Sequence, residues 1–172
     1  SYKNFSKSDR VLCVGEGEGR NAVFLARAGY NVAAIDASDI ALQKLEALAL
    51  ENDVHVDTRC IDLNEWVPTK KYGAVVASYL HLPSSQKTEI FSKIESQLRH
   101  NGFFVIEVFS KNQLNYSSGG PKDEDLLYSI EDFQEALQHS IIHKLEEVEI
   151  TLDEGKGHQG KASVIRVIAQ RN

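Results

Sequence analysis

The sequence predicts a doubly wound α/β domain, with a mainly parallel sheet and a C-terminal antiparallel hairpin. Three observations lead to this fold class. Short apolar runs alternate with helix-like stretches over residues 11–109. Two further apolar runs, at 146–152 and 162–169, flank a glycine-rich connector. The length of 172 residues suits one domain over 1–172, in which 1–10 form a short flexible N-terminal segment.

The beginning of the chain predicts a strand, a helix and a second strand. The apolar run at 11–14 is stopped by glycine, which is typical of a buried strand. Residues 20–29 place alanine and leucine at helical spacing and end on Gly29, a favourable helix C-cap. The second strand is expected at 31–35 and is closed by Asp36. This order predicts two parallel strands joined by a right-handed crossover.

The next elements continue the alternation. A helix is expected at 40–52, because a Ser-Asp pair suited to a helix N-cap precedes leucines at helical spacing. A strand at 55–61 carries apolar residues among polar neighbours. Only about ten residues connect it to the next strand, which is short for a crossover helix. That next strand, at 73–80, is the most apolar of the chain and is followed by a Pro-Ser turn.

The remaining pattern is weaker. An amphipathic helix at 86–98 leads through an Asn-Gly turn to a strand at 103–109. The polar stretch at 110–125 has no periodicity and is expected to be a loop. A less regular helical pattern covers 130–142 and precedes the hairpin.

The composition disfavours several kinds of partner. A formal net charge of −6 offers no basic surface for nucleic acid or anionic membranes, so neither is an expected partner. No apolar run approaches the roughly 18–20 residues of a membrane span, and no signal-peptide pattern opens the chain, so a cytoplasmic location is expected. Cys13 and Cys60 both lie in apolar runs, and we expect two reduced, buried thiols.

A glycine-rich loop follows the first strand. Gly15, Gly17 and Gly19 lack Cβ atoms, so the chain can turn sharply and a ligand can approach the backbone. The helix that follows presents free N–H groups at its N-terminus. Asp36 lies about 20 residues further on, where an acid can accept hydrogen bonds from ribose hydroxyls. The pattern predicts a nucleotide-like ligand at the carboxyl ends of the strands.

The loop alone does not select the ligand. The frame from Gly17 to Ala22 satisfies the dinucleotide fingerprint, so an NAD-dependent oxidoreductase is an alternative. Glu16 and Glu18 argue against NAD, because they would face a doubly negative pyrophosphate. Carboxylates suit a ligand that carries an ammonium group and a sulfonium better.

These residues resemble the class I (Rossmann-like) S-adenosylmethionine-dependent methyltransferases, in particular a small bacterial subgroup related to tellurite-resistance methyltransferases. The segment VLCVGEGEGRNAVFLARAGYNVAAIDASDIAL is similar to the first two motifs of that subgroup. CIDL, ASYLHLP and HNGFFVIE resemble its next three motifs. QLNYSSGGPKDEDLLYS and LDEGKGHQGKAS resemble its loops. The resemblance extends from about residue 11 to the end of the chain, and it implies a Rossmann-like methyltransferase fold.

The resemblance implies an S-adenosylmethionine site, with S-adenosylhomocysteine as product. Asp36 would hold the ribose, Asp62 would accept from the adenine amino group, and the Leu63 N–H would donate to the ring. Ser78 and Tyr79 would flank the methionine portion. The full implied site is Gly15, Glu16, Gly17, Gly19, Arg20, Asn21, Asp36, Ala37, Ser38, Asp62, Leu63, Ser78 and Tyr79.

Within that set, Ala37 and Ser38 would lie beside the adenine. Arg20 and Asn21 at a helix start are hypothesised, from charge complementarity, to hold the methionine carboxylate. The chain departs from the family at Cys13, where an acidic residue usually helps to anchor the ammonium group. Glu16 could take over that role.

The expected acceptor is a small molecule such as a thiol or a chalcogen oxyanion, since motifs of adenine, glutamine and cytosine methylation are absent. A soft acceptor needs mainly alignment, whereas a hydroxyl or amine needs a general base. His81 is the first candidate base or acceptor contact, followed by His158, with Tyr116 as a further acceptor contact. His139 and His143 have i, i+4 spacing but no third ligand, so no metal is expected.

Three hypotheses therefore stand. The first is an S-adenosylmethionine-dependent methyltransferase acting on a small acceptor. The second is the NAD-dependent oxidoreductase. The third is a non-catalytic cofactor-binding protein, suggested by Cys13 and by the ten residues before the first strand. A monomer and a dimer are both compatible with the sequence.

Overall fold

A seven-stranded sheet runs through the part of the chain that the computed structural model describes, residues 6–15, 19–153, 157 and 159–172. The strands are β1 (Arg10–Val14), β2 (Asn31–Asp36), β3 (Asp57–Cys60), β4 (Tyr72–Ser78), β5 (Leu98–Phe109), β6 (Ser140–Asp153) and β7 (Gln159–Arg171). The helices are α1 (Arg20–Arg27), α2 (Asp39–Glu51), α3 (Ser84–Ser96) and α4 (Ile130–Ala136), with the 3₁₀ turns η2 (Lys111–Asn115) and η3 (Glu124–Leu126).

The strand order is β3-β2-β1-β4-β5-β7-β6. Strands β1 to β5 pair in parallel, and β7 pairs antiparallel with both β5 and β6. The chain builds outward from β1 on one side and from β4 on the other, so the strand order reverses between them. This arrangement confirms the predicted doubly wound sheet with its C-terminal hairpin, and ligands bind at such a reversal point.

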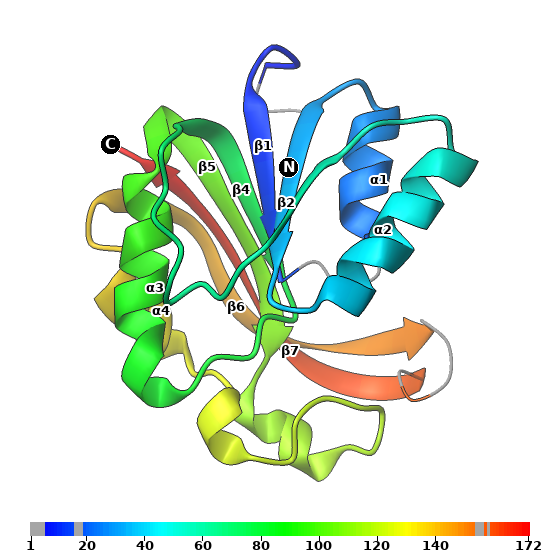
Figure 1. The fold of residues 1–172 in the computed structure, drawn as a ribbon. Coiled ribbons are helices and arrows are strands. Elements are labelled where there is room, and N and C mark those ends of the chain that lie inside the picture. Colours follow the sequence, from blue (N-terminus) through cyan, green and yellow to red (C-terminus); the bar gives the residue numbers. More distant parts are fainter. Residues whose placement is uncertain (1–5, 16–18, 154–156, 158) are drawn as a thin grey trace.

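Helices cover both faces of the sheet. Helices α1 and α2 lie together on one side, and α3 and α4 on the other (Figure 1). Successive residues of β1 alternate between these layers, because Val11 and Cys13 pack in the α1–α2 cluster whereas Leu12 and Val14 pack in the α3–α4 cluster. A strand buried on both faces reads as a continuous apolar run, which explains the VLCV signal.

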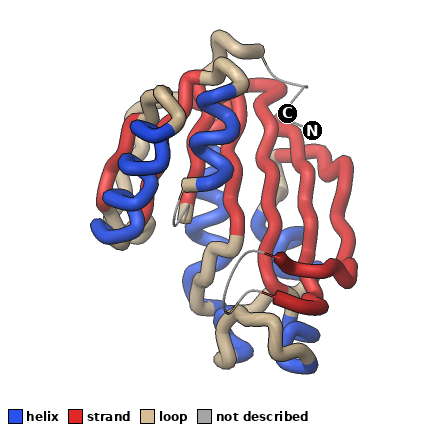
Figure 2. The backbone as a smooth tube through the Cα atoms, turned by 90° about the vertical axis from the view of Figure 1, so that its right-hand side faces the viewer, coloured by secondary structure: helices blue, strands red, loops and turns tan. Residues whose placement is uncertain are grey.

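The largest buried side chains lie on the α3–α4 side. Phe91 and Phe133 contact one another and Tyr128, with ring centroids 5.4 to 5.9 Å apart. Beyond this core, the far ends of β6 and β7 bend out of the sheet (Figures 1 and 2). No helix in the described part of the chain is long and apolar enough to cross a membrane.

The predicted helix over 130–142 is wrong in its second half. Helix α4 ends at Ala136, and β6 begins at Ser140. The long antiparallel ladder with β7 supplies backbone partners from residue 140 onward, and this tertiary pairing overrides a weak helical pattern. His139 and His143 therefore do not share a helix face, and His143 Nε2 lies 2.8 Å from Gln170 Oε1.

The predicted Asn-Gly turn lies inside a strand. Strand β5 begins at Leu98, five residues before the predicted start, and Leu98 pairs with Tyr72. Asn101 takes a φ of 63°, so the turn-forming pair makes an irregularity in the strand rather than a connection. Helix α3 consequently ends at Ser96 instead of residue 98.

Local signals at the first helices are confirmed. The Ser38 hydroxyl caps α2 by accepting a hydrogen bond from the Ala41 N–H at 3.2 Å. Gly29 takes the left-handed conformation just after α1, with a φ of 94°. The prediction of two buried thiols holds for Cys13 but is wrong for Cys60, which is exposed because β3 is the edge strand of the sheet.

The predicted loop at 110–125 contains the 3₁₀ turns η2 and η3. The buried Gln113 side chain holds it on β7, since its Oε1 accepts from the Ser163 N–H at 2.8 Å. Its Nε2 donates to Ser118 Oγ at 3.0 Å. A side-chain network of this kind leaves no periodicity in the sequence.

Candidate functional site

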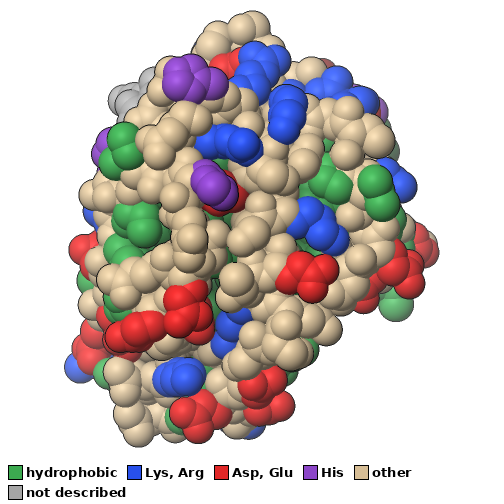
Figure 3. All heavy atoms as spheres, turned by 90° about the vertical axis from the view of Figure 1, so that its left-hand side faces the viewer, with side chains coloured by type: hydrophobic (Ala, Val, Ile, Leu, Met, Phe, Trp, Pro, Cys, Tyr) green, Lys and Arg blue, Asp and Glu red, His purple; other side chains and the backbone are tan. Residues whose placement is uncertain are grey.

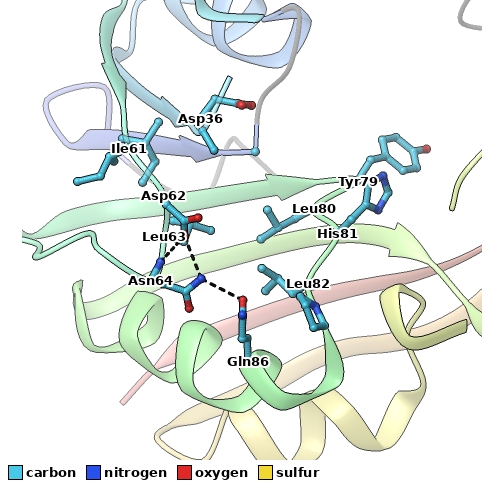
Figure 4. Close-up of a pocket in the computed structure, with 14 residues that line it drawn as sticks. Asp36, Ile61, Asp62, Leu63, Asn64, Tyr79, Leu80, His81, Leu82 and Gln86 are labelled. Carbon is cyan, nitrogen blue, oxygen red and sulfur yellow. Dashed lines mark hydrogen bonds between the residues drawn. The ribbon is translucent and has the colours of Figure 1, made fainter. Parts of the chain in front are cut away.

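A cavity of about 470 Å³ lies at the carboxyl ends of β1, β2 and β4, where the strand order reverses (Figure 4). It is lined by Gly15, Ile35, Asp36, Ala37, Ile61, Asp62, Leu63, Asn64, Tyr79, Leu80, His81, Leu82, Pro83 and Gln86. Its size is within the range of small-molecule sites. Because parallel strands bring their carboxyl ends to one edge, residues far apart in the sequence meet here.

Asp36 is the last residue of β2 and faces this cavity. Its Oδ1 accepts a hydrogen bond from the Ser38 N–H at 2.8 Å. This short Asx-type turn fixes the carboxylate and also leads into the N-cap of α2. The carboxylate is therefore oriented by the backbone that follows β2.

Asp62 supplies a second carboxylate on the β3–β4 connection. Its Oδ1 accepts from the Asn64 N–H at 2.8 Å and from Asn64 Nδ2 at 2.9 Å. Asn64 Nδ2 also donates to Gln86 Oε1 of α3 at 3.1 Å (Figure 4). Sequence reasoning missed Asn64 and Gln86. The Asp-x-Asn spacing is a signal for an Asx turn, whereas the contact with α3 has no local signal.

The cavity combines these acids with an apolar wall and a free backbone donor. Among the described residues, no group accepts a hydrogen bond from the Leu63 N–H. Ile35, Ile61, Leu80 and Leu82 provide apolar surface around it. A donor next to an acceptor, flanked by apolar side chains, suits a planar heterocycle with a hydrogen-bonding edge.

Two glycines bring the backbone close to neighbouring elements. Gly15 follows β1 with a φ of 64°, and a Cβ atom on it would lie 2.7 Å from Leu80 Cδ1. Gly19 precedes α1 with a φ of 88°, and its Cβ would lie 2.4 Å from Leu45 Cγ. Both positions therefore favour glycine for conformation. Gly19 also requires it for space, whereas a side chain at Gly15 would displace the Leu80 methyl group.

One end of the cavity is aromatic and carries a charged network. Tyr79 has a φ of 53°, and its hydroxyl donates to Glu107 Oε1 at 2.6 Å. Arg166 Nε donates to Glu107 Oε2 at 2.7 Å. The Tyr79 ring lies 4.8 Å from that of Phe109, centroid to centroid. Sequence reasoning missed Glu107, Arg166 and Phe109, because they come from β5 and β7, which only the folded sheet places beside β4.

His81 lies at the same end. Its exposed ring stacks over Phe109 with an interplanar angle of 16° and a centroid distance of 6.3 Å. Figure 4 shows the Tyr79 and His81 rings side by side, directed away from Asp36 and Asp62. The cavity thus has an acidic, apolar end and an aromatic end.

The other predicted site residues lie around or beyond the cavity. Ser78 Oγ accepts a hydrogen bond from Asn21 Nδ2 at 2.9 Å, which joins β4 to α1. Arg20 lines a separate hollow beside α2. Tyr116 donates to Glu149 Oε2 at 2.6 Å on β6. Glu16, Gly17 and His158 lie outside the described residues.

The hydrogen bond between Tyr116 and Glu149 shifts the pKa of both groups. The hydrogen bond to the carboxylate raises the pKa of Tyr116, and the same bond lowers the pKa of Glu149. Tyr116 is thus held by β6, and it is not among the residues that line the cavity. No group of three or more metal-binding side chains occurs in the described part of the chain.

The polar and apolar groups that line the cavity fit S-adenosylmethionine. Two fixed carboxylates, Asp36 and Asp62, face one cavity together with a free N–H and an apolar wall. Carboxylates can accept from ribose hydroxyls and from an adenine amino group, and they attract a cation. A pyrophosphate would instead meet negative charge.

A family described as "Methyltransferase domain" matches residues 11–102. The chain is 26% identical over 162 residues to a ubiquinone biosynthesis O-methyltransferase of Rickettsia bellii (strain OSU 85-389), covering 91% of this chain and 68% of that protein. This chain covers only 33% and 58% of the lengths of two other curated relatives, so it spans only part of those proteins.

Two solved structures have the same fold. A methyltransferase of Methanosarcina mazei described as S-adenosylmethionine-dependent aligns with a TM-score of 0.79 at 15% identity, covering 99% of this chain and 95% of that one. TehB of Haemophilus influenzae aligns with a TM-score of 0.78 at 18% identity, covering 96% of this chain and 58% of that one. The predicted Rossmann-like fold is confirmed.

Proposed function

Because this chain belongs to the methyltransferase domain family of class I S-adenosylmethionine-dependent enzymes, we propose that it transfers a methyl group from S-adenosylmethionine to a small-molecule acceptor. One observation carries the proposal: the fixed carboxylates of Asp36 and Asp62 face one cavity at the point where the strand order reverses.

The acidic end of the cavity would hold the cofactor. Asp36 would accept from the ribose hydroxyls, Asp62 from the adenine amino group, and the Leu63 N–H would donate to the ring. Asn64 and Gln86 keep the Asp62 carboxylate in place. When bound, S-adenosylmethionine supplies a methyl group that is already activated on a sulfonium.

The aromatic end would bind the acceptor. Tyr79 and Phe109 offer an apolar surface that excludes water, and Glu107 holds the Tyr79 hydroxyl. An imidazole nitrogen of His81 would accept the proton that a thiol or hydroxyl loses. His158 is a second candidate for this role. The main contribution is alignment, which can supply roughly 7–11 kcal/mol in well-oriented reactions.

The proposed acceptor is a thiol or a chalcogen oxyanion, and a hydroxyl is the second candidate. A soft nucleophile needs little beyond alignment, which the apolar surface of Tyr79 and Phe109 can supply. The aromatic rings of Tyr79, His81 and Phe109, together with the similarity to an O-methyltransferase, favour the second candidate.

Calorimetry with S-adenosylhomocysteine, S-adenosylmethionine and NADH tests the cofactor assignment. We expect the Asp36→Ala variant to bind S-adenosylhomocysteine at least tenfold more weakly, because the ribose hydroxyls lose their acceptor. Asp153→Ala, which removes an exposed carboxylate at the end of β6, is the matched control and should keep full affinity. Tight binding of NADH alone would reject the proposal.

Turnover against thiols, selenite, tellurite, phenols and small amines tests the acceptor. His81→Asn and His158→Asn should be compared on each substrate that is methylated. If His81 removes a proton, its variant loses at least tenfold in kcat at neutral pH and recovers at higher pH, where the acceptor ionises by itself. An unchanged pH profile would reject His81 as the base.

A further inference from the structure

A second cavity, of about 350 Å³, lies on the α3–α4 side of the sheet, over β1, β2 and β3. In the described chain, the connection between β3 and β4 contains no helix, so this part of the sheet is covered only by an extended segment. Trp66 from that segment is buried and packs in the same core cluster as Leu12. The cavity forms where this thin cover meets the strands.

Three cationic side chains line the cavity. They are Arg10 at the start of β1, Arg59 on β3 and Lys70 just before β4. None of them lies within ion-pair distance of a carboxylate among the described residues. The cavity also contains Asp57, whose Oδ1 lies 2.8 Å from Nε2 of His55. The cavity therefore has a surplus of positive charge, although the chain as a whole is acidic.

Tyr72 is a second and independent feature of this cavity. Its side chain lines the cavity and is only 7% exposed, yet its hydroxyl makes no hydrogen bond with any described residue. Buried hydroxyl groups normally have a partner, and an unpaired one is unfavourable. Burial raises the pKa of Tyr72, and the charges of Arg10 and Arg59 lower it, so both guanidinium groups act on this hydroxyl.

From this arrangement, we propose that the cavity over β1, β2 and β3 binds the phosphate group of a small phosphomonoester. Guanidinium groups bind phosphate through paired N–H donors, and the Tyr72 hydroxyl adds a neutral donor in the same cavity. The cavity is larger than one tetrahedral anion needs, and Leu12, Ile35 and Trp66 form an apolar wall. That wall suits the organic part of the ester.

The charge distribution favours a small ligand over a nucleic acid. Figure 3 shows the α3 side of the molecule, where basic side chains gather toward the end at which β1 and β4 begin and acidic ones toward the opposite end. A long polyanion would meet both regions, whereas a small phosphomonoester contacts only the cavity. The acidic total charge of the chain points in the same direction.

This cavity is distinct from the one at the carboxyl ends of the strands. Ile35 is the residue that lines both of them in the described chain, and it precedes Asp36. The proposal does not depend on methyl transfer. It requires only the fold and the side chains of β1, β3, β4 and the segment before β4.

Calorimetry at constant ionic strength tests the proposal with two probes, inorganic phosphate and phenyl phosphate. We expect saturable 1:1 binding of both, at least threefold tighter for phenyl phosphate because its ring contacts the apolar wall. Equal affinities would assign the site to free phosphate. Absence of saturable binding of either probe would overturn the proposal.

Variants inside and outside the cavity test where phenyl phosphate binds. Arg59→Gln should weaken binding of phenyl phosphate at least tenfold, and Tyr72→Phe by about threefold or more, since each removes a donor but keeps most of the packing. Arg27→Gln is the matched control, because it removes the same charge from an exposed position on α1 outside the cavity. An equal loss in Arg27→Gln would overturn the proposal in favour of non-specific charge attraction.

Affinity for S-adenosylhomocysteine, measured on the same samples, shows whether each variant is folded. Arg59 is exposed on the edge strand, so Arg59→Gln should retain the wild-type affinity for that ligand. A wild-type chain that binds phenyl phosphate but not S-adenosylhomocysteine would reject the proposed methyltransferase function and keep the phosphate site. The opposite result would reject only the phosphate site.

Discussion

At the residue scale, Gly15 and Gly157 separate two reasons for a glycine. Both have a positive φ, of 64° and 85°, but a Cβ on Gly15 would lie 2.7 Å from Leu80 Cδ1, whereas a Cβ on Gly157 would meet nothing within 4 Å. Gly15→Ala should therefore lower the free energy of unfolding by about 1–3 kcal/mol and weaken S-adenosylhomocysteine binding at least tenfold.

Gly157→Ala is the control, because it carries backbone strain without the steric conflict. Urea titration and calorimetry on both variants check the comparison. If Gly15→Ala kept wild-type affinity, Leu80 would not be needed in its observed position for the cofactor cavity.

The buried Lys87 side chain predicts how the stability of the fold depends on pH. Its side chain is 2% exposed, donates to the Leu127 carbonyl and lies over the Tyr128 ring, with Asp132 3.8 Å away. Burial lowers its pKa. Between that lowered pKa and the usual lysine range, the unfolded chain binds more protons than the folded one, so the contribution of Lys87 to stability rises with pH.

Lys87→Met removes this titration. The free energy of unfolding of the wild type, minus that of Lys87→Met, should increase with pH as the solution passes from the lowered pKa toward the usual lysine range. Urea titrations at several alkaline pH values measure it. A difference that stays flat or falls with pH would contradict the assignment.

Residue-level prediction from sequence works where the signal is local. Asp36 follows an apolar run and Gly15 ends one, so both could be named from their neighbours and both line the cavity. Glu107 and Arg166 could not be named in this way. They meet Tyr79 only because β5 lies between β4 and β7 in the folded sheet.

At the element scale, the segment between η3 and α4 supports the cavity. The buried Tyr128 hydroxyl donates to the Leu80 carbonyl at 2.8 Å, and Leu80 belongs to the loop that lines the cavity between β4 and α3. Asp125 Oδ2 accepts from the Ser84 N–H at 3.2 Å, at the start of α3. Tyr128, just after η3, and Asp125, within η3, thus fix one wall of the site.

Tyr128→Phe tests this support. The ring contacts with Phe91 and Phe133 remain, but the Leu80 carbonyl loses its partner, so we expect a loss of about 1–2 kcal/mol in stability and a two- to fivefold weaker S-adenosylhomocysteine affinity. Tyr30→Phe, in the cluster on the other face of the sheet, serves as the control for affinity. An equal loss of affinity in both would indicate a general effect on the fold.

The types and order of the helices and strands could be predicted throughout the described chain, and their bounds closely as far as α3. The strands and helices up to residue 96 differ from the predicted ones only at their ends, because each carries its own periodicity and caps. Beyond that point, the early starts of β5 and β6 depend on partners distant in the sequence. Pairing of this kind leaves no trace in a short window.

At the scale of the whole molecule, ligand binding should stabilise the fold by mass action. A concentration of S-adenosylhomocysteine one hundred times its Kd adds about 2.7 kcal/mol, which corresponds to a rise in Tm of about 5–10 °C for a domain of this size. Differential scanning fluorimetry with S-adenosylhomocysteine and NADH in parallel measures it. A rise with NADH only would contradict the cofactor assignment.

Strand β6 is 14 residues long and ends the sheet, and its outer edge pairs with no other strand in the described part of the chain. Such an edge can template the addition of a strand from another molecule, which begins aggregation. Three glutamates, Glu146, Glu147 and Glu149, lie along it. Two copies brought edge to edge would therefore repel each other at neutral pH. Because hydrogen bonds lower the pKa of Glu147 and of Glu149, only acid below the usual glutamate range neutralises them, and under that condition this protein should be most prone to self-association.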